Sequence, residues 1–237
     1  MEPLGIISGI ILLQRKGIFQ DLEEKEIATE FGKVLVFLSD TIAFIPRHGK
    51  NPKKHILPHL INHQANLKAL KDIGVKEVIS VNSTGSLKKK LKPGTIVVPD
   101  DYIMLPGTPT TLHDKAIHIT PRLSFEVRQK WLHAAHDCAI KVVDGGAYWQ
   151  TTGPRLETKA EIKMMSRFAA LVGMTMASEA AISQELGLSY AALCSVDNYG
   201  HGIEEKELTI EEILQHARRN TDVILKIVMR YIERRRG

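Results

Sequence analysis

Short apolar runs rich in β-branched residues alternate with longer amphipathic segments along this chain, and this alternation most limits the fold that it can adopt. The strand-like runs lie at 4–13, 34–38, 41–46, 77–82, 95–99, 141–148, 171–174 and 190–196. Helical periodicity marks 61–73, 122–138, 158–168, 178–186 and 210–233. Strands alternating with helices are typical of α/β domains, in which helices cover the faces of a sheet. The sequence therefore predicts a three-layer-like α/β sandwich around a mixed β-sheet.

A single domain over residues 1–237 is expected, because neither an internal repeat nor a low-complexity linker interrupts the chain. The apolar run Leu4–Leu13 resembles the core of a signal peptide, but no basic residue precedes it and it is too short to cross a bilayer. We expect it to form the first core strand. The two cysteines, Cys138 and Cys194, show no disulfide-framework or metal-binding spacing, which favours a reducing, cytoplasmic compartment.

The net charge of +5 raises the possibility of a nucleic-acid partner. Much of the excess positive charge, however, sits in two short clusters, at 88–92 and at 234–236. Aromatic residues make up only 5% of the chain, too few for the stacking platforms of single-strand binders. We therefore expect neither nucleic acid nor a membrane as partner. A small anionic substrate would use the positive field equally well.

Two polar segments follow strand-like runs and suit the binding of an anion. Arg47-His48-Gly49 ends one run, and arginine offers a planar fork of donors to phosphate. Asn82–Leu87 ends another, with small hydroxyl residues around Gly85 that let backbone N–H groups approach an anion. The alternatives are a surface ion pair for Arg47 and a ligand-free polar turn for Asn82–Leu87.

Three histidines follow at four-residue intervals, at His55, His59 and His63, a spacing that would place them on one helical face. No carboxylate or cysteine accompanies them, so a partly buried, hydrogen-bonded face is favoured over a metal site. We expect no metal.

Three further segments put polar residues at strand ends or helix starts. Gly153–Thr158 predicts a turn before a helix, with a capping box between Thr158 and Glu161. Gly173–Met176 and Ser195–Gly200 each end a strand. Taken singly, each segment could be explained without a functional role, either by charge at a helix terminus or by the polar residues that turns prefer.

Taken in order, the segments resemble the trimeric purine nucleoside phosphorylase family, and especially its methylthioadenosine phosphorylase branch. The resemblance extends from about Gly5 to Leu214, and seven matching blocks in one order are more specific than any one of them. The blocks are Arg47-His48-Gly49, Asn62–Asn66, Thr84–Leu87, Pro93–Val97, Gly153-Pro154-Arg155, Ala160-Glu161 and Gly173-Met174-Thr175.

The resemblance implies a distorted mixed sheet and a homo-oligomer, a trimer or a dimer of trimers, with sites at subunit interfaces. The implied reaction is attack by inorganic phosphate on C1' of a purine nucleoside, which releases the base and a pentose 1-phosphate. Phosphate is then a co-substrate, and no metal or organic cofactor is implied.

Residue roles carried over from the resemblance fall into two groups. The implied phosphate-binding residues are Arg47, His48, Asn82, Ser83 and Thr175. The implied nucleoside-binding residues are His118, Glu157, Met174, Asp197, Asn198, Tyr199 and Ile210. Met174 would pack on the ribose, and Asp197 would be the catalytic residue at N7, where negative charge arrives. His118 resembles a histidine that reaches the neighbouring subunit's 5' side, and Ile210 replaces a 5'-hydroxyl-binding histidine, which favours a 5'-methylthio group.

The chain departs from the family pattern at its opening turn, where Ile10 stands in place of a phosphate-binding hydroxyl residue. It also carries an insertion, Lys50–Lys54, that would add cations near the phosphate. The first departure keeps a second enzyme open, a nucleosidase in which water replaces phosphate. A third alternative is a nucleoside-binding oligomer without strong catalysis.

The implied residues disagree about the base. Asp197 resembles the aspartate of aminopurine-cleaving members, whereas Glu157 resembles the glutamate that accepts from N1–H in oxopurine-specific members. The sequence favours the aminopurine, because Asp197 would act at the atom where charge develops in the transition state.

Overall fold

In the computed structural model, which describes residues 2–9, 21–105, 107, 109–205 and 210–236, eleven strands form one mixed sheet with five α-helices around it. The described strands are β1 (Leu4–Ser8), β2 (Glu23–Thr29), β3 (Gly32–Leu38), β4 (Ile42–Pro46), β5 (Glu77–Ser86), β6 (Ile96–Val98), β7 (Asp101–Met104), β8 (Val143–Asp144), β9 (Ala147–Gln150), β10 (Leu171–Gly173) and β11 (Ser189–Tyr199). The helices are α1 (His63–Asp72), α2 (Phe125–Asp137), α3 (Lys159–Met165), α4 (Met176–Glu185) and α5 (Ile210–Arg236).

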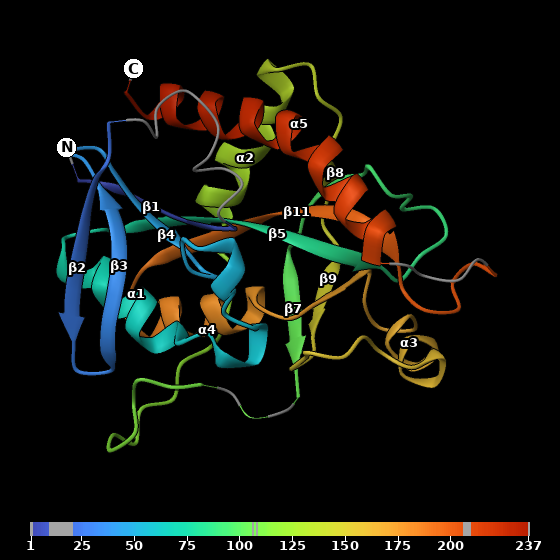
Figure 1. Cartoon of the computed structure of the whole chain (residues 1–237), viewed down its shortest axis with the longest axis horizontal. Coiled ribbons are helices and arrows are strands. Elements are labelled where there is room, and N and C mark those ends of the chain that lie inside the picture. The colour runs from blue at the N-terminus through green and yellow to red at the C-terminus, as the bar shows by residue number, and fades with distance from the viewer. Residues whose placement is uncertain (1, 10–20, 106, 108, 206–209, 237) are drawn as a thin grey trace.

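Helices cover both faces of the sheet, which gives the three layers that the sequence predicts (Figure 1). On one face α1 and α4 bury small and branched side chains such as Leu67, Leu70 and Ala180 against the strands. On the other face α2 and α5 do the same with Trp131 and Ile227. Within the described residues, no helix combines the length and the apolar composition needed to cross a membrane.

The sheet order brings the ends of several parallel strands to one edge. The main path runs β2-β3-β4-β1-β5-β10-β9-β7, and β11, β6 and β8 branch from β5. β1 is parallel to both β4 and β5, and β11 is parallel to β5 with a register shift between Val196 and Asn198. The chain leaves β1 and β4 at Ser8 and Arg47, where the Arg47 amide donates to the Ser8 carbonyl, whereas β5 and β11 continue to Ser86 and Tyr199.

The predicted element types are confirmed, with differences at their ends. The 141–148 run divides into β8 and β9, because Gly145 and Gly146 adopt φ values of 92° and 107° that break the strand. The capping box at Thr158 and Glu161 is present at the start of α3. The sequence missed β2, whose mainly charged residues pair antiparallel with β3 in an exposed hairpin. Residues 10–13 of the first predicted strand lie outside the described residues.

Candidate active site

Arg47, which follows β4, lies buried rather than at the surface, with only 4% of its surface exposed. Its Nε and Nη2 donate to the two carboxylate oxygens of Glu179 on α4, at 2.6 and 3.0 Å. Nη1 donates to the carbonyl of Val81 and Nη2 also to that of Ile7. Four of the five guanidinium hydrogens are therefore used within the described residues, and one on Nη1 is left for a ligand. Sequence reasoning missed Glu179, because 132 residues separate it from Arg47.

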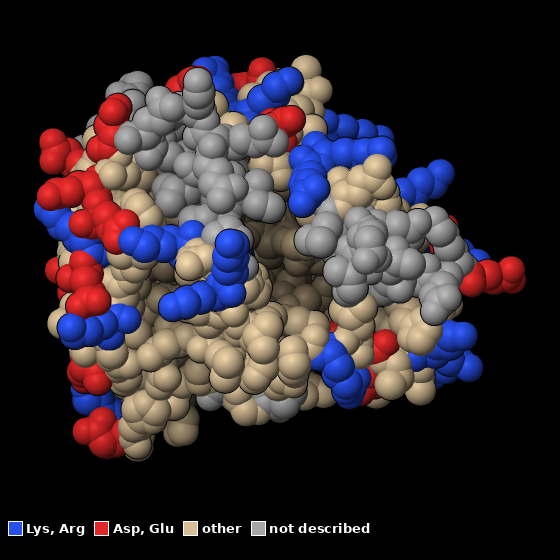
Figure 2. Space-filling view, in the orientation of Figure 1, with Lys and Arg blue, Asp and Glu red and all other residues tan. Residues whose placement is uncertain are grey.

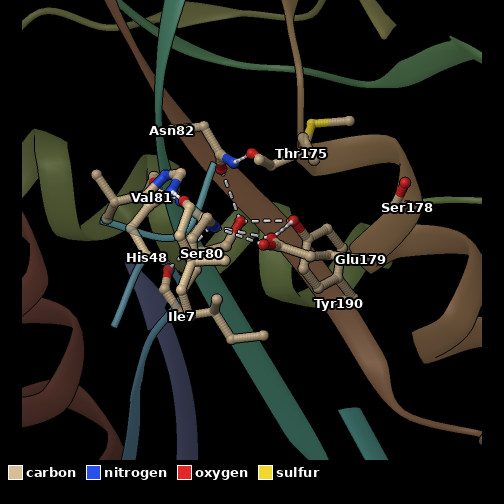
Figure 3. A network of polar contacts seen from close by, with 12 residues as sticks. Ile7, His48, Ser80, Val81, Asn82, Thr175, Ser178, Glu179 and Tyr190 are labelled. Atoms are coloured by element: carbon tan, nitrogen blue, oxygen red, sulfur yellow. Dashed lines mark hydrogen bonds and ion pairs between the residues drawn. The ribbon is translucent and has the colours of Figure 1, made fainter. Parts of the chain in front are cut away.

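A chain of polar contacts runs from this ion pair to the predicted phosphate residues (Figure 3). Tyr190 donates to Glu179 at 2.8 Å, and its hydroxyl lies 2.5 Å from that of Ser80. Ser80 in turn contacts Asn82, whose Nδ2 donates to Thr175 Oγ1 at 2.9 Å. Because Thr175 already accepts this bond, its own hydroxyl hydrogen is available to a ligand. The structure thus brings together Asn82 and Thr175, two of the residues that the resemblance assigns to phosphate.

His48 lies beside Arg47 with a defined tautomer. Its Nδ1 lies 2.8 Å from the carbonyl of Ile56, which can only accept, so Nδ1 carries the hydrogen. The ring of His55 stacks on His48 with centroids 4.3 Å apart. Burial, and next the charge of Arg47, lower the pKa of His48 to about 4. At neutral pH its Nε2 is therefore an acceptor, suited to a protonated oxygen of a ligand.

The three regularly spaced histidines do not share a helical face, contrary to the expectation from their spacing. His55 follows one short 3-10 turn, His59 lies in a second, and only His63 belongs to α1. The prolines at 52 and 58 begin these turns, and they prevent one continuous helix. Lys50, the first residue of the Lys50–Lys54 insertion, forms an ion pair with Glu24 of β2.

Asp197 on β11 is a buried carboxylic acid, 1% exposed. Ser195 donates to its Oδ1 at 2.5 Å and Asn220 of α5 at 2.9 Å. Burial raises the pKa of Asp197, and the hydrogen bonds from Ser195, Ser83 and Asn220 oppose that rise. The structure therefore associates Ser83, a predicted phosphate residue, with Asp197. A buried acid with a raised pKa is suited to deliver a proton.

Glu157 is a second buried carboxyl group, 8% exposed, in the loop before α3. Thr151 donates from Oγ1 to its Oε1 at 2.6 Å, which fixes the carboxyl group and leaves Oε2 for another donor. The same loop packs on Met174, since a Cβ at Gly153 would lie 2.6 Å from the Met174 sulfur. Sequence reasoning identified Glu157 and Met174 but not Thr151.

The remaining predicted residues are less central or lie outside the description. Tyr199 Oη donates to the Lys89 carbonyl at 3.1 Å, and Asn198 Nδ2 donates to the Tyr199 carbonyl, so both side chains are engaged with nearby backbone. His118 is exposed in the long segment between β7 and α2. Ile210 begins α5, but its side chain and the whole of Ile10 are outside the described residues.

A cavity of about 200 Å³ opens beside these residues. Its walls come from the 58–63 segment, the ends of β7 and β9 and the start of α4, with side chains that include Ile61, His63, Met104, Met174 and Ser178. A space-filling view shows a hollow near the middle of one face, with Lys and Arg side chains beside it (Figure 2). No group of three His, Cys, Asp or Glu residues in the described chain is arranged to hold a metal ion.

The depressed histidine pKa values predict a loss of stability in acid. The pKa of His63 is lowered by burial, and next by Arg47, to about 3, and that of His48 to about 4. In the unfolded chain both titrate near the ordinary value of about 6.5, so between about pH 7 and pH 4 the unfolded state takes up more protons. We expect the free energy of unfolding to fall over this range, measured by urea titration. His63→Gln should flatten the dependence, and an equally steep curve in this variant would contradict the assignment.

Comparisons with known proteins identify the family of the chain. The sequence profile described as "Phosphorylase superfamily" matches residues 11–233. The "Probable 6-oxopurine nucleoside phosphorylase" of Archaeoglobus fulgidus is 42% identical over 230 residues, covering 95% of this chain and 93% of that protein. The "Probable S-methyl-5'-thioinosine phosphorylase" of Methanocaldococcus jannaschii is 36% identical, with coverages of 97% and 91%. The "S-methyl-5'-thioadenosine phosphorylase" of Pyrococcus furiosus is 33% identical, with coverages of 98% and 92%.

Solved structures show the same fold. A methylthioadenosine phosphorylase from an Antarctic soil metagenomic library superposes with a TM-score of 0.84 at 26% identity, covering 98% of this chain and 85% of that one. The methylthioadenosine phosphorylase of Schistosoma mansoni, solved with adenine, gives a TM-score of 0.84 at 23% identity, with coverages of 98% and 91%. With a profile match over nearly its whole length and relatives above 30% identity, the chain belongs to the phosphorylase superfamily.

Proposed function

We propose that this protein is a 6-oxopurine nucleoside phosphorylase, in which phosphate attacks C1' of the nucleoside and the base leaves. The observation that carries the proposal is that two carboxyl groups, Asp197 on β11 and Glu157 before α3, are buried in a chain that also holds the hydroxyl of Thr175 against Asn82. The hydroxyl can donate a hydrogen bond to phosphate, and a buried carboxyl group can donate a proton to the leaving base.

Each residue has a defined task in this reaction. The free hydrogens of Thr175 and Arg47 Nη1 bind phosphate oxygens, and His48 Nε2 accepts a hydrogen from a protonated one. As the phosphate oxygen bonds to C1', the electron pair of the glycosidic bond passes to N9 of the purine and spreads to N7. Asp197, whose pKa is raised by burial, would donate to N7 from its protonated form. Stabilising charge that develops only in the transition state accelerates the chemical step.

Glu157 supports the 6-oxopurine over the aminopurine that the sequence favours through Asp197. Thr151 occupies one oxygen of Glu157, so the other is positioned to accept a single N–H. A 6-oxopurine carries a hydrogen at N1, whereas adenine presents a bare acceptor there and would repel the carboxylate. Asp197 can protonate N7 of either base. The relatives at 36–42% identity also carry oxopurine names.

The test is an assay of base release with and without phosphate, with analysis for pentose 1-phosphate. A phosphorylase requires phosphate and yields the base and the sugar phosphate in equal amounts. Equal base release without phosphate would instead establish the nucleosidase alternative, and no release would leave a binding protein.

Comparing 5'-methylthioinosine with inosine also checks the 5' preference expected from Ile210. We expect about tenfold in favour of the methylthio substrate, since burying an unpaired hydroxyl costs about 1–3 kcal/mol.

Thr151 should matter for oxopurine substrates in particular. Thr151→Val removes the bond to Glu157, and a hydrogen bond to a charged group is worth about 1.5–3 kcal/mol. We expect kcat/KM for inosine or methylthioinosine to fall by about 10- to 100-fold, with a smaller change for the 6-amino substrates. Thr152→Val, which changes a neighbouring threonine that lines the cavity, is the control. Equal losses on both bases would show that Thr151 only supports the loop.

We also propose a cytoplasmic homo-oligomer, a trimer or a dimer of trimers. Large apolar side chains are exposed on the chain, including Leu60, Leu105, Ile117 and Phe125 at 54–71% exposure. Ile117 adjoins His118, the residue expected to reach a neighbouring subunit. Sedimentation equilibrium measures the mass, and a monomer would contradict this assembly.

A further inference from the structure

His63 is a buried histidine whose Nδ1 has no hydrogen-bond partner among the residues that the structure describes. Its side chain is at the start of α1, and only 6% of the residue is exposed. Nδ1 is fully enclosed and makes no hydrogen bond. Because Nδ1 is enclosed and the ring lines the cavity, Nε2 is the ring nitrogen that a ligand in the cavity can reach, and buried polar groups are normally paired.

The tautomer of His63 can be inferred from the free-energy cost of burying Nδ1 either as an unpaired N–H or as an unpaired acceptor. A buried N–H without an acceptor is rarer than a buried acceptor without a donor. In a neutral ring, the enclosed Nδ1 therefore carries the lone pair and Nε2 carries the hydrogen. His63 is accordingly a donor toward the cavity, through Nε2. Burial and the charge of Arg47 keep the ring neutral, since they lower its pKa to about 3.

The cavity lies next to the residues assigned to phosphate. Met174 lines it, and the next residue, Thr175, accepts from Asn82 and offers its hydroxyl to phosphate. The sugar must lie there, because phosphate attacks its C1' atom. Ile61, Met104 and Met174 form an apolar part of the wall that matches the carbon face of a pentose, and the rest of the lining is polar. Glu157 and Asp197 already account for the base.

We propose that His63 is a specificity-determining residue, whose Nε2 donates a hydrogen bond to a hydroxyl oxygen of the ribose. This inference rests on the proposed function and adds to it a contact for the sugar. A neutral donor suits a hydroxyl, whereas phosphate is better matched by the charged Arg47. Ser178, on the same cavity wall, already contacts Gln150 and Met104. Of the two histidines that line the cavity, His63 is buried and His59 is exposed.

The experiment compares the nucleoside with its 2'-deoxy and 3'-deoxy analogues in wild type and in His63→Leu, by kcat/KM. In wild type, loss of the contacted hydroxyl should lower kcat/KM at least tenfold. In His63→Leu this penalty should shrink to less than about threefold for the same analogue, while the other analogue's penalty is unchanged. His59→Leu, which changes another histidine of the same cavity, should keep the wild-type pattern.

Two further variants guard against a simple loss of folding. Glutamine places its amide nitrogen where Nε2 lies, and asparagine places it near Nδ1, so His63→Gln should restore the penalty and His63→Asn should not. Unchanged penalties in all His63 variants would overturn the inference. A raised KM for phosphate with unchanged penalties would also overturn it, and would assign the donor to phosphate. Absence of any phosphorolysis in wild type would instead contradict the proposed function itself.

Discussion

Replacing Arg47 by alanine is expected to lower the free energy of unfolding by about 3–5 kcal/mol. The reason is that Glu179, 1% exposed, would remain as a buried charge without its cation, and removing one partner of a buried pair costs about that much. Urea unfolding of the two proteins measures the difference.

The chain contains a matched control, because Arg155 makes the same two-pronged contact with Glu161 at the surface. Arg155→Ala should cost much less, since exposed ion pairs contribute little. The double variant Arg47→Met/Glu179→Leu should recover most of the lost stability, because an apolar pair of similar volume replaces both charges. Equal losses for Arg47→Ala and Arg155→Ala would contradict the role of burial.

The Arg47→Met/Glu179→Leu protein also separates stability from activity. If Arg47 Nη1 binds phosphate as proposed, this folded variant should show a strongly raised KM for phosphate while the KM for nucleoside changes little. The loss of a charged donor at a desolvated site is worth roughly 2–5 kcal/mol. An unchanged phosphate dependence would remove Arg47 from the site and leave it as a structural residue.

The second large effect is expected at the two buried carboxyl groups. Asp197→Asn should lower kcat by about 10²–10⁴ for both 6-oxo and 6-amino substrates, because it removes the acid that we propose as the donor to N7. Glu157→Gln should instead change the ratio between the two bases by at least about tenfold against the 6-oxo substrate, or roughly 1.4 kcal/mol.

These two variants decide between the bases. Steady-state kcat/KM values for matched 6-oxo and 6-amino nucleosides are the measurement, and circular dichroism checks that each variant folds. If Asp197→Asn lowered only the 6-amino activity, and Glu157→Gln left the ratio unchanged, the aminopurine assignment from the sequence would be correct. The resulting enzyme would still be a phosphorylase.

Local features of the site were determined by the sequence alone. The capping box between Thr158 and Glu161 depends on a three-residue spacing, and Asn62 caps α1 by the same rule. The alternation of strands and helices predicted the layers, and the resemblance supplied Arg47, Asp197 and Glu157 as candidates. The helix caps and the layers follow from short-range order and backbone periodicity, which a sequence displays directly, whereas the candidate residues came from the resemblance.

The partners of those candidates were decided only by the tertiary structure. Glu179 lies 132 residues from Arg47, Thr175 lies 93 from Asn82, and Asn220 lies 23 from Asp197. Sheet register and helix packing bring such residues together, and no local pattern encodes which pairs meet. The same packing sets their chemistry, because it buries Asp197 and raises its pKa, and encloses His63 and keeps it neutral. The sequence by itself determined which residue types reach the strand ends. The tertiary structure decided the contacts and protonation states of these residues, because contacts depend on distance and protonation depends on burial.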